Sequence, residues 1–314
     1  MYSRAVSSRA FTRPAARDGG GPRARTTASK LEGFLAVLFG AAVLGLSAIF
    51  VKWAVAGGAT ATTVGFYRML FALPGVFLLA RRQGKVGAGA GRTWGLVAGA
   101  ALFLDLWLWH LAMHDTTAAN ATLLVSGLAP VWVALFSMAA LHLRHDALAW
   151  LGQALGLGGA LILALAKGAR GGTGRGELLA IVASFCYAAF TLALKRSRHT
   201  LQAEQALFWM TAGCLLCFLP VVLVTGAPLG GYSGRTWLSL LGLGVVVHVV
   251  GWWSATWGLG HTNAALGAIA LQGQQVATMF LAVWLLGEPL KPLGLLGAAA
   301  ILVGIVLVAR NRAV

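Results

Sequence analysis

The sequence predicts an all-α integral membrane protein of ten transmembrane helices, arranged as two inverted five-helix repeats. The first observation is composition: 59% of the 314 residues are hydrophobic and only 10% are charged, against about 25% charged in a typical soluble domain. The second is a series of apolar runs, each of roughly the ~20 residues that cross a bilayer as a helix. The third is a pattern in the first half of the chain that recurs in the second half.

The apolar runs are separated by short polar segments, so consecutive helices should be antiparallel neighbours. A helix satisfies all its backbone hydrogen bonds internally, which is why each run is read as a helix and not as an extended segment. The runs lie at residues 34–55, 60–80, 93–113, 117–140, 147–166, 178–195, 204–225, 236–257, 263–286 and 293–309.

The net charge of +16 is distributed in the way a membrane protein sets its orientation. Seven of the basic residues lie in residues 1–30, which we interpret as a disordered basic cytoplasmic tail. With both termini placed in the cytoplasm, the inner segments carry 17 Lys and Arg and the outer segments carry 5, as the positive-inside rule requires. This distribution argues against a nucleic-acid partner, and the lack of an apolar run before residue 34 argues against a cleaved signal peptide.

The repeat appears when the chain is shifted by 146 residues. Thr116 then falls on Thr262 and Gly127 on Gly273, and after one residue is dropped Gly159 falls on Gly304. Each copy holds five helices. Since five is odd, the second copy enters the membrane upside down.

The repeat divides the chain into a first five-helix unit at 31–168 and a second at 176–310. Inverted repeats are typical of secondary transporters, whose substrate site lies near the bilayer midplane between the copies.

Arg68 and Asp105 are the two ionisable residues expected deepest in the membrane, about 12 Å from the outer ends of their helices. Charges at this depth are costly and usually functional, so we expect both to face one central cavity. Three interpretations remain open: an ion pair that orders the bundle, a site where Asp105 receives a substrate amine and Arg68 a carboxylate, or a proton-coupling role for Asp105.

Several aromatic and histidine side chains could line the same cavity. Trp109 shares a helix face with Asp105, and His248, Trp253 and Tyr187 lie within apolar runs of the second half. An interfacial belt position is the alternative for Trp109, and a hydrogen bond to a neighbour is the alternative for His248. Lys195, at the inner end of its run, is interpreted as a loop-facing cation.

Gln272 and Gln275 share a face of the run at 263–286. Neutral polar residues can simply bond across helices, but three glutamines within four residues exceed what packing needs, so we expect this face to line the cavity. The runs at 147–166 and 293–309 carry glycines at close-packing spacing and are predicted to be packing helices, against each other and away from the substrate.

No pattern in the sequence indicates an enzyme. Nucleotide-binding loops, metal clusters and nucleophile triads have no counterpart here, so we expect neither cofactor nor metal. Cys186, Cys214 and Cys217 all fall inside apolar runs, where they are interpreted as small packing residues.

The segment GHTNAALGAI…LLGEPLKPLGLLGAAAILVGIVL of the second unit closely resembles the signature region of the EamA-type drug/metabolite transporter superfamily. LSAIFVKWA at 46–54 and FYRML at 66–70 are also similar to that family's first two helices. The first copy departs from the signature, with Leu141-His142 in place of the Gly-Glu of the turn. The resemblance implies ten helices in two repeats and is greatest to bacterial amino-acid exporters of the inner membrane.

The sequence therefore predicts a monomeric secondary transporter in the lipid bilayer that exports small metabolites, with amino acids as the expected substrate and proton coupling as an option. A drug or nucleotide-derivative carrier and a channel-like facilitator are the alternatives. The expected substrate-binding residues are Arg68, Asp105, Trp109, Tyr187, His248, Trp253, Gln272 and Gln275.

Overall fold

The computed structural model describes residues 30–84, 86, 89–115, 118–141, 147–166, 174–287 and 289–310. Throughout these residues the regular structure is helical, with no strand. The predicted basic tail lies outside the described residues except for Lys30, and so do His142 and Glu288. The helices of the first half are α1 (Lys30–Leu44), α2 (Leu46–Ala56), α3 (Ala61–Arg82), α4 (Ala90–Asp115), α5 (Ala118–Leu141) and α6 (Ala147–Ala166).

The second half is less regular. Its elements are α7 (Arg175–Ser197), α8 (Ala203–Thr225), α9 (Gly234–Gly242), the π-helix η1 (Leu243–Trp252), α10 (Trp253–Leu259), α11 (Ala264–Leu271), α12 (Gly273–Leu286) and α13 (Pro292–Arg310). Each predicted apolar run coincides with one helix or one set of consecutive helices, within a few residues at either end. Local signals explain several boundaries: Asn263 Oδ1 accepts a hydrogen bond from Leu266 N at 2.7 Å, which caps α11, and Gly287 ends α12 in the left-handed conformation.

Three of the predicted helices are interrupted. Gly45 separates α1 from α2, and Gln272 separates α11 from α12. The π-helix η1 joins α9 to α10, so these three elements form one continuous helical segment. Periodicity of apolar residues does not reveal such breaks, because the apolar run continues through them. Short π segments inside α-helices occur frequently at functional sites.

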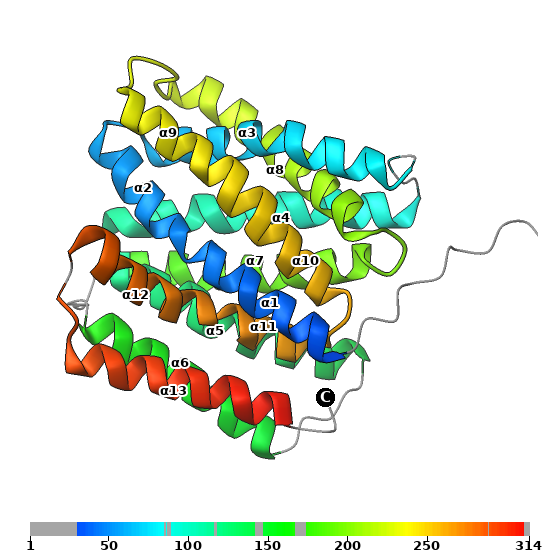
Figure 1. Cartoon of the computed structure of the whole chain (residues 1–314), viewed down its shortest axis with the longest axis vertical. Coiled ribbons are helices and arrows are strands. Elements are labelled where there is room, and N and C mark those ends of the chain that lie inside the picture. The colour runs from blue at the N-terminus through cyan, green and yellow to red at the C-terminus, as the bar shows by residue number, and fades with distance from the viewer. Residues whose placement is uncertain are drawn as a thin grey trace, which may run out of the picture.

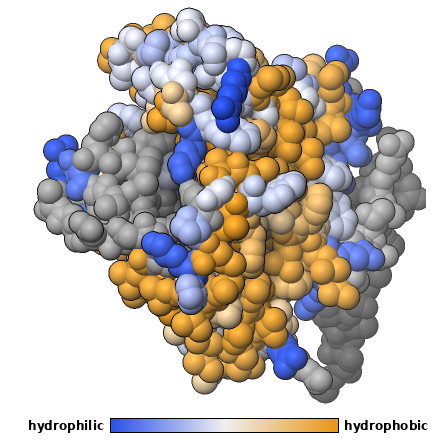
Figure 2. All heavy atoms as spheres, turned by 60° about the vertical axis from the view of Figure 1, so that its left-hand side comes forward, coloured by the Kyte–Doolittle hydropathy of each residue, from blue (hydrophilic) through white to orange (hydrophobic). Residues whose placement is uncertain are grey.

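Within the described residues, seven helical segments are long and apolar enough to cross a membrane. Two shorter apolar stretches, Leu124–Phe136 and Trp150–Ile162, lie within α5 and α6. Large apolar side chains such as Leu223 and Trp284 are 72% and 80% exposed, which is unfavourable in water and expected against lipid. Figure 2 shows this surface as broad orange areas, with hydrophilic residues in separate groups. The protein is therefore a multi-pass membrane protein.

The two halves of the chain are interleaved. Figure 1 shows blue and cyan helices of the first half lying among yellow and orange helices of the second. α4 packs on α7 and α8, α3 on α8, α1 on α10, and α6 on α13. The largest apolar cluster accordingly joins both halves, with Met69 and Leu102 packed together with Phe190, Met210 and Phe218.

α6 and α13 lie side by side at the edge of the bundle (Figure 1) and approach closely through glycine. A Cβ added at Gly159 would lie 2.6 Å from the carbonyl oxygen of Gly297, and one added at Gly304 would lie 2.6 Å from the carbonyl oxygen of Gly152. Only glycine permits this backbone contact. The predicted packing of these two helices against each other is confirmed.

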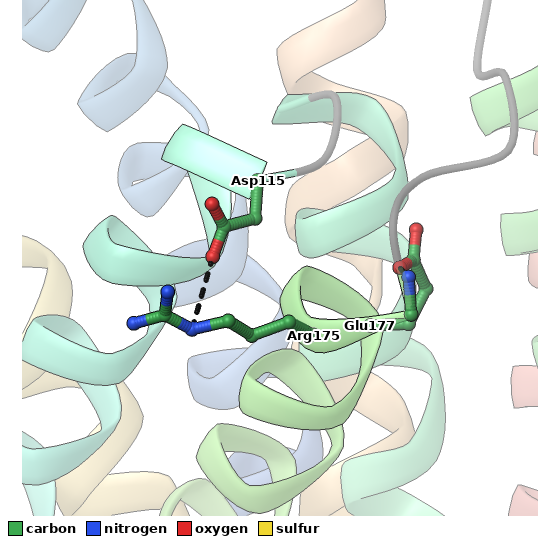
Figure 3. Close-up of polar contacts among 4 residues, drawn as sticks. Asp115, Arg175 and Glu177 are labelled. Carbon is green, nitrogen blue, oxygen red and sulfur yellow. Dashed lines mark hydrogen bonds and ion pairs between the residues drawn. The ribbon is translucent and has the colours of Figure 1, made fainter.

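Both ends of α7 make polar contacts with neighbouring helices. Figure 3 shows Arg175, the first residue of α7, reaching Asp115 at the end of α4, with Nε and Oδ2 3.4 Å apart. In the same first turn, Glu177 accepts a hydrogen bond from Gly174 N at 2.9 Å. This carboxylate satisfies one of the free N–H groups with which every helix begins.

At the opposite end of α7, two cations cap α10. Lys195 Nζ donates to the carbonyls of Leu259, at 3.2 Å, and Thr262, and Arg198 Nε donates to the carbonyl of Thr256 at 3.2 Å. These are the last carbonyls of α10 and those just beyond it, where positive charge complements the helix dipole. The prediction that Lys195 simply faces a loop is wrong, because its neighbour in space is a helix end distant in the sequence.

Candidate functional site

Arg68 and Asp105 lie in the interior of the bundle, on α3 and α4. Asp105 is only 4% exposed, and the two charges interact electrostatically. Yet no ion pair joins them, and one oxygen of the carboxylate, Oδ1, is buried without a hydrogen-bond partner among the described residues. Arg68 is similar: its Nε is buried and unpartnered. The two residues face a common region, as expected, but do not neutralise each other by direct contact.

Arg68 is held from one side by α2. Its Nη1 donates to the Ser47 hydroxyl at 3.4 Å, a long hydrogen bond. Ser47 follows directly on the break at Gly45, and the Gly45 carbonyl accepts a hydrogen bond from the Thr278 hydroxyl of α12 at 3.1 Å. The break between α1 and α2 therefore connects the arginine to the second half of the chain.

His248 contributes a third buried polar group and lies within the π-helix η1. Its side chain is fully buried, and its Nε2 shares a 2.8 Å hydrogen bond with the Thr211 hydroxyl of α8. The Thr211 hydroxyl donates its hydrogen to the Leu207 carbonyl. Its oxygen can therefore accept a hydrogen bond from a protonated His248 Nε2. That leaves Nδ1 as the buried atom without a partner. His248 also interacts electrostatically with Arg68.

Tyr187 of α7 completes the group. It interacts electrostatically with both Arg68 and Asp105, and its ring packs edge-on against Phe190 with centroids 5.6 Å apart. Cys214 of α8 is fully buried beside the same charges. All three cysteines are free thiols. Among the described residues no group of three His, Cys, Asp or Glu side chains could hold a metal ion.

We define the central polar cluster as Ser47, Arg68, Asp105, Tyr187, Thr211 and His248. It draws side chains from α2, α3 and α4 of the first half and from α7, α8 and η1 of the second. Its Arg68 Nε, Asp105 Oδ1 and His248 Nδ1 are buried without partners. Each unsatisfied buried polar atom costs about 1–3 kcal/mol. Three such atoms among residues that come from both halves make this cluster the candidate site.

Ser47 and Thr211 are members that sequence reasoning missed. Both are single hydroxyl residues in apolar helices, and helices use such residues commonly for local hydrogen bonds to their own carbonyls. No spacing signal distinguishes them. Only the crossing of α2 over α3 and of η1 over α8 makes them partners of Arg68 and His248.

One of the two tryptophans expected in the cavity, Trp253, lies elsewhere. Trp253 is 36% exposed, and its Nε1 donates to Glu204 of α8 at 2.8 Å. Its neighbour Trp252 is the buried one, 4% exposed and packed edge-on against Phe190. The assignment of Trp253 to the interior is therefore corrected in favour of Trp252. Trp109 packs with Ala112, Val125 and other side chains between α4, α5 and α7.

The glutamines carry further buried polar atoms, and Gln272 places its own against α6. Gln272 is 3% exposed and neither its Oε1 nor its Nε2 has a partner, and Nε2 of Gln275 is likewise unpartnered. Gln272 lies against α6, where a Cβ added at Gly156 would meet its Oε1 at 2.9 Å. Gln153 of α6 is also buried with an unpartnered Oε1. The sequence predicted that Gln272 and Gln275 line the cavity; Gln272 is buried and faces the packing helix α6.

Comparisons with known proteins agree with this architecture. The sequence profile of the EamA-like transporter family matches twice, at residues 31–165 and 174–310. Among solved structures, a crystal structure superimposes with a TM-score of 0.74, at 19% sequence identity, over 90% of this chain and 98% of that one. This likeness shows the fold alone. No curated protein matches the sequence.

The family match covers both halves and nearly all of the described helices. Members of this family are membrane transporters of small molecules, and the interior polar site between the halves is consistent with that activity. The chain belongs to the EamA-like transporter family.

Proposed function

We propose that this protein is a secondary transporter that exports small zwitterionic metabolites, amino acids in the first place, by alternating access. The observation that carries the proposal is the unpaired state of Arg68 and Asp105, each with a buried polar atom that lacks a partner. A zwitterion presents one carboxylate and one ammonium group. It would pair with both residues at once and satisfy them without leaving a net charge in the membrane interior.

The supporting architecture is ten membrane crossings in two inverted copies, with both termini in the cytoplasm and the protein in the inner membrane. The family profile matches each half separately, which supports two copies of one unit. The start of α1 and the end of α13 lie toward the same side of the bundle in Figure 1. The excess of basic residues in the segments on this side supports its placement in the cytoplasm.

The interrupted helices supply places where the bundle could bend. Gly45 lies two residues before Ser47, which accepts the hydrogen bond from Arg68. Gln272 lies between α11 and α12, and η1 contains His248. Discontinuous helices near the substrate are a recurring feature of transporters with inverted repeats. Binding of a zwitterion at the central polar cluster would connect the break at Gly45, through Ser47, with η1, through His248, so movement of these two segments can depend on occupancy.

The test is counterflow in proteoliposomes. Vesicles containing the purified protein are loaded with unlabelled substrate, and uptake of labelled substrate is followed for a panel of amino acids, nucleosides and cationic drugs. A carrier for zwitterions shows uptake of one or more amino acids that is accelerated by the same amino acid inside.

Two outcomes contradict the proposal. Uptake that is indifferent to internal substrate identifies a channel-like facilitator. Accelerated uptake of cationic drugs alone, or of nucleosides alone, leaves Arg68 without a carboxylate to bind and overturns the zwitterion assignment. Empty vesicles and vesicles with heat-denatured protein provide the background.

A further inference from the structure

A line of aromatic rings and two arginines lies on the surface of the bundle, away from the central polar cluster. The rings of Phe77 on α3 and Phe208 on α8 have centroids 5.5 Å apart, and Phe208 and Trp209 are 5.0 Å apart. Arg81 lies over Phe77 at 5.6 Å, and Arg92 of α4 lies over Trp209 at 4.3 Å. We call these five residues the arginine–aromatic shelf.

The two guanidinium groups of the shelf have free hydrogen-bonding capacity. Both arginines are exposed, and within the part of the chain that the structure describes neither guanidinium group has a carboxylate partner or a hydrogen bond to another residue. One face of each guanidinium group stacks on an aromatic ring, and the N–H groups at its edge can still donate hydrogen bonds to a ligand. Arg81 lies in the last turn of α3 and Arg92 near the start of α4, and each such fork can donate hydrogen bonds to a phosphate.

The position of Arg92 is not explained by the helix that carries it. Arg81 is in the last turn of α3, where a cation complements the helix dipole. Arg92, in contrast, is the third residue of α4, where a cation opposes the positive end of the dipole. A bound anion would remove this conflict.

The surroundings identify the source of the anion. Phe77, Leu78 and Trp94 are apolar neighbours along these helices, with exposed fractions of 37%, 62% and 40%. Tryptophan and arginine at the end of an apolar helix surface are typical of the level of the lipid headgroups. We propose that the arginine–aromatic shelf binds the phosphate of an anionic phospholipid, with the acyl chains lying along α3 and α4.

Phosphatidylglycerol binding to the purified full-length protein in detergent tests the proposal, read by native mass spectrometry and by the shift of the thermal unfolding midpoint. Each arginine near an anionic headgroup contributes about fivefold, so Arg81→Gln with Arg92→Gln should weaken binding about 30-fold. Phosphatidylcholine, which has no net charge, should bind the wild-type protein no better than this double variant. Inorganic phosphate at equal concentration should not displace the lipid, because it lacks acyl chains.

Arg235 supplies a matched control. It also lies over a tryptophan, at 5.3 Å from Trp53, but it is a single cation on the opposite side of the bundle. Arg235→Gln should leave phosphatidylglycerol binding unchanged. The proposal is contradicted if Arg235→Gln loses as much phosphatidylglycerol binding as the double variant, or if the double variant binds phosphatidylglycerol as well as the wild-type protein does. Should the glutamine variant fail to fold, Arg81→Lys with Arg92→Lys keeps the charge and removes the planar forks: weaker binding supports the proposal and undiminished binding contradicts it.

Discussion

At the scale of single residues, the unusual feature is an acid and a base that share the membrane interior without an ion pair. Arg68 is held by Ser47 and interacts with Asp105 and His248 at a distance. A directly bonded pair would be the cheaper arrangement in a low-dielectric interior, because it leaves no polar atom unsatisfied. The unsatisfied atoms of Arg68 and Asp105 therefore favour a ligand site over a purely structural pair.

Asp105→Asn tests this at the residue scale. A hydrogen bond to a charged group is worth about 1.5–3 kcal/mol, so loss of the carboxylate should slow transport at least about tenfold, measured as the initial rate of counterflow. The protein should still fold, because Asn has nearly the same shape and no partner of Asp105 Oδ1 is lost.

Asp115, on the same helix, is the control for this substitution. It is exposed enough to reach Arg175 at the surface, and exposed ion pairs contribute about 0–1 kcal/mol. Asp115→Asn should therefore transport at the wild-type rate. If Asp105→Asn also transports normally, at normal expression, then the assignment of this residue to the substrate site, to proton coupling or to an essential ion pair is wrong.

At the scale of elements, the pair of α6 and α13 is held by backbone contact through glycine. Gly158 and Gly159 are consecutive residues with opposite surroundings. A Cβ at Gly159 would meet the carbonyl oxygen of Gly297 at 2.6 Å and Ile301 N at 2.8 Å, whereas a Cβ at Gly158 would meet no atom within 4 Å. Alanine at each of the two positions therefore distinguishes the effect of helix propensity on stability from the effect of packing between α6 and α13.

Gly159→Ala should lower the free energy of unfolding by about 1–3 kcal/mol, because the added methyl group overpacks the contact with α13. Gly158→Ala should raise it by about 0.5–1 kcal/mol, because alanine favours the helix and nothing opposes its methyl group. Unfolding midpoints in detergent, followed by circular dichroism, measure both. Equal effects of the two substitutions would show that α6 and α13 do not touch at Gly159.

At the scale of the whole molecule, the central polar cluster exists only where the two halves meet. Arg68 and Asp105 come from the first half, and Tyr187, Thr211 and His248 from the second. The apolar faces of α1, α3, α4 and α6 are covered mainly by α7, α8, α10 and α13. Arg68 is bonded to Ser47 within the first half and His248 to Thr211 within the second, and the packing of the halves brings these two pairs together.

Separate expression of residues 1–165 and 174–314 tests this interdependence. Each half alone should be unstable in the membrane and rapidly degraded, because its principal helix contacts are missing. Co-expression should restore both and allow them to be purified together through a tag on one. Accumulation of a stable first half by itself would contradict the interleaved packing, and a tagged unrelated membrane protein controls for non-specific association.

The position of nearly every helix, the membrane class and the two family units could be predicted from the sequence, because each depends on local properties. Apolar length decides where a helix lies in a membrane. The small-residue registers at Gly159 and Gly304 indicated a close contact of α6 and α13, because few other side chains permit one. The inverted relationship of the halves and the number of crossings stay predictions.

The direction of each side chain was decided only by tertiary structure. Trp252 and Trp253 are equally apolar neighbours, and only the packing of η1 and α10 turns the first inward and the second toward Glu204. Gln272 was expected to line the cavity, and its contact with α6 could not be predicted from the sequence of its own helix. By itself the sequence determined which segments leave water, because transfer to lipid depends on local composition. The grouping of Arg68, Asp105, Tyr187 and His248 required the fold, because contacts between distant segments depend on how the helices cross.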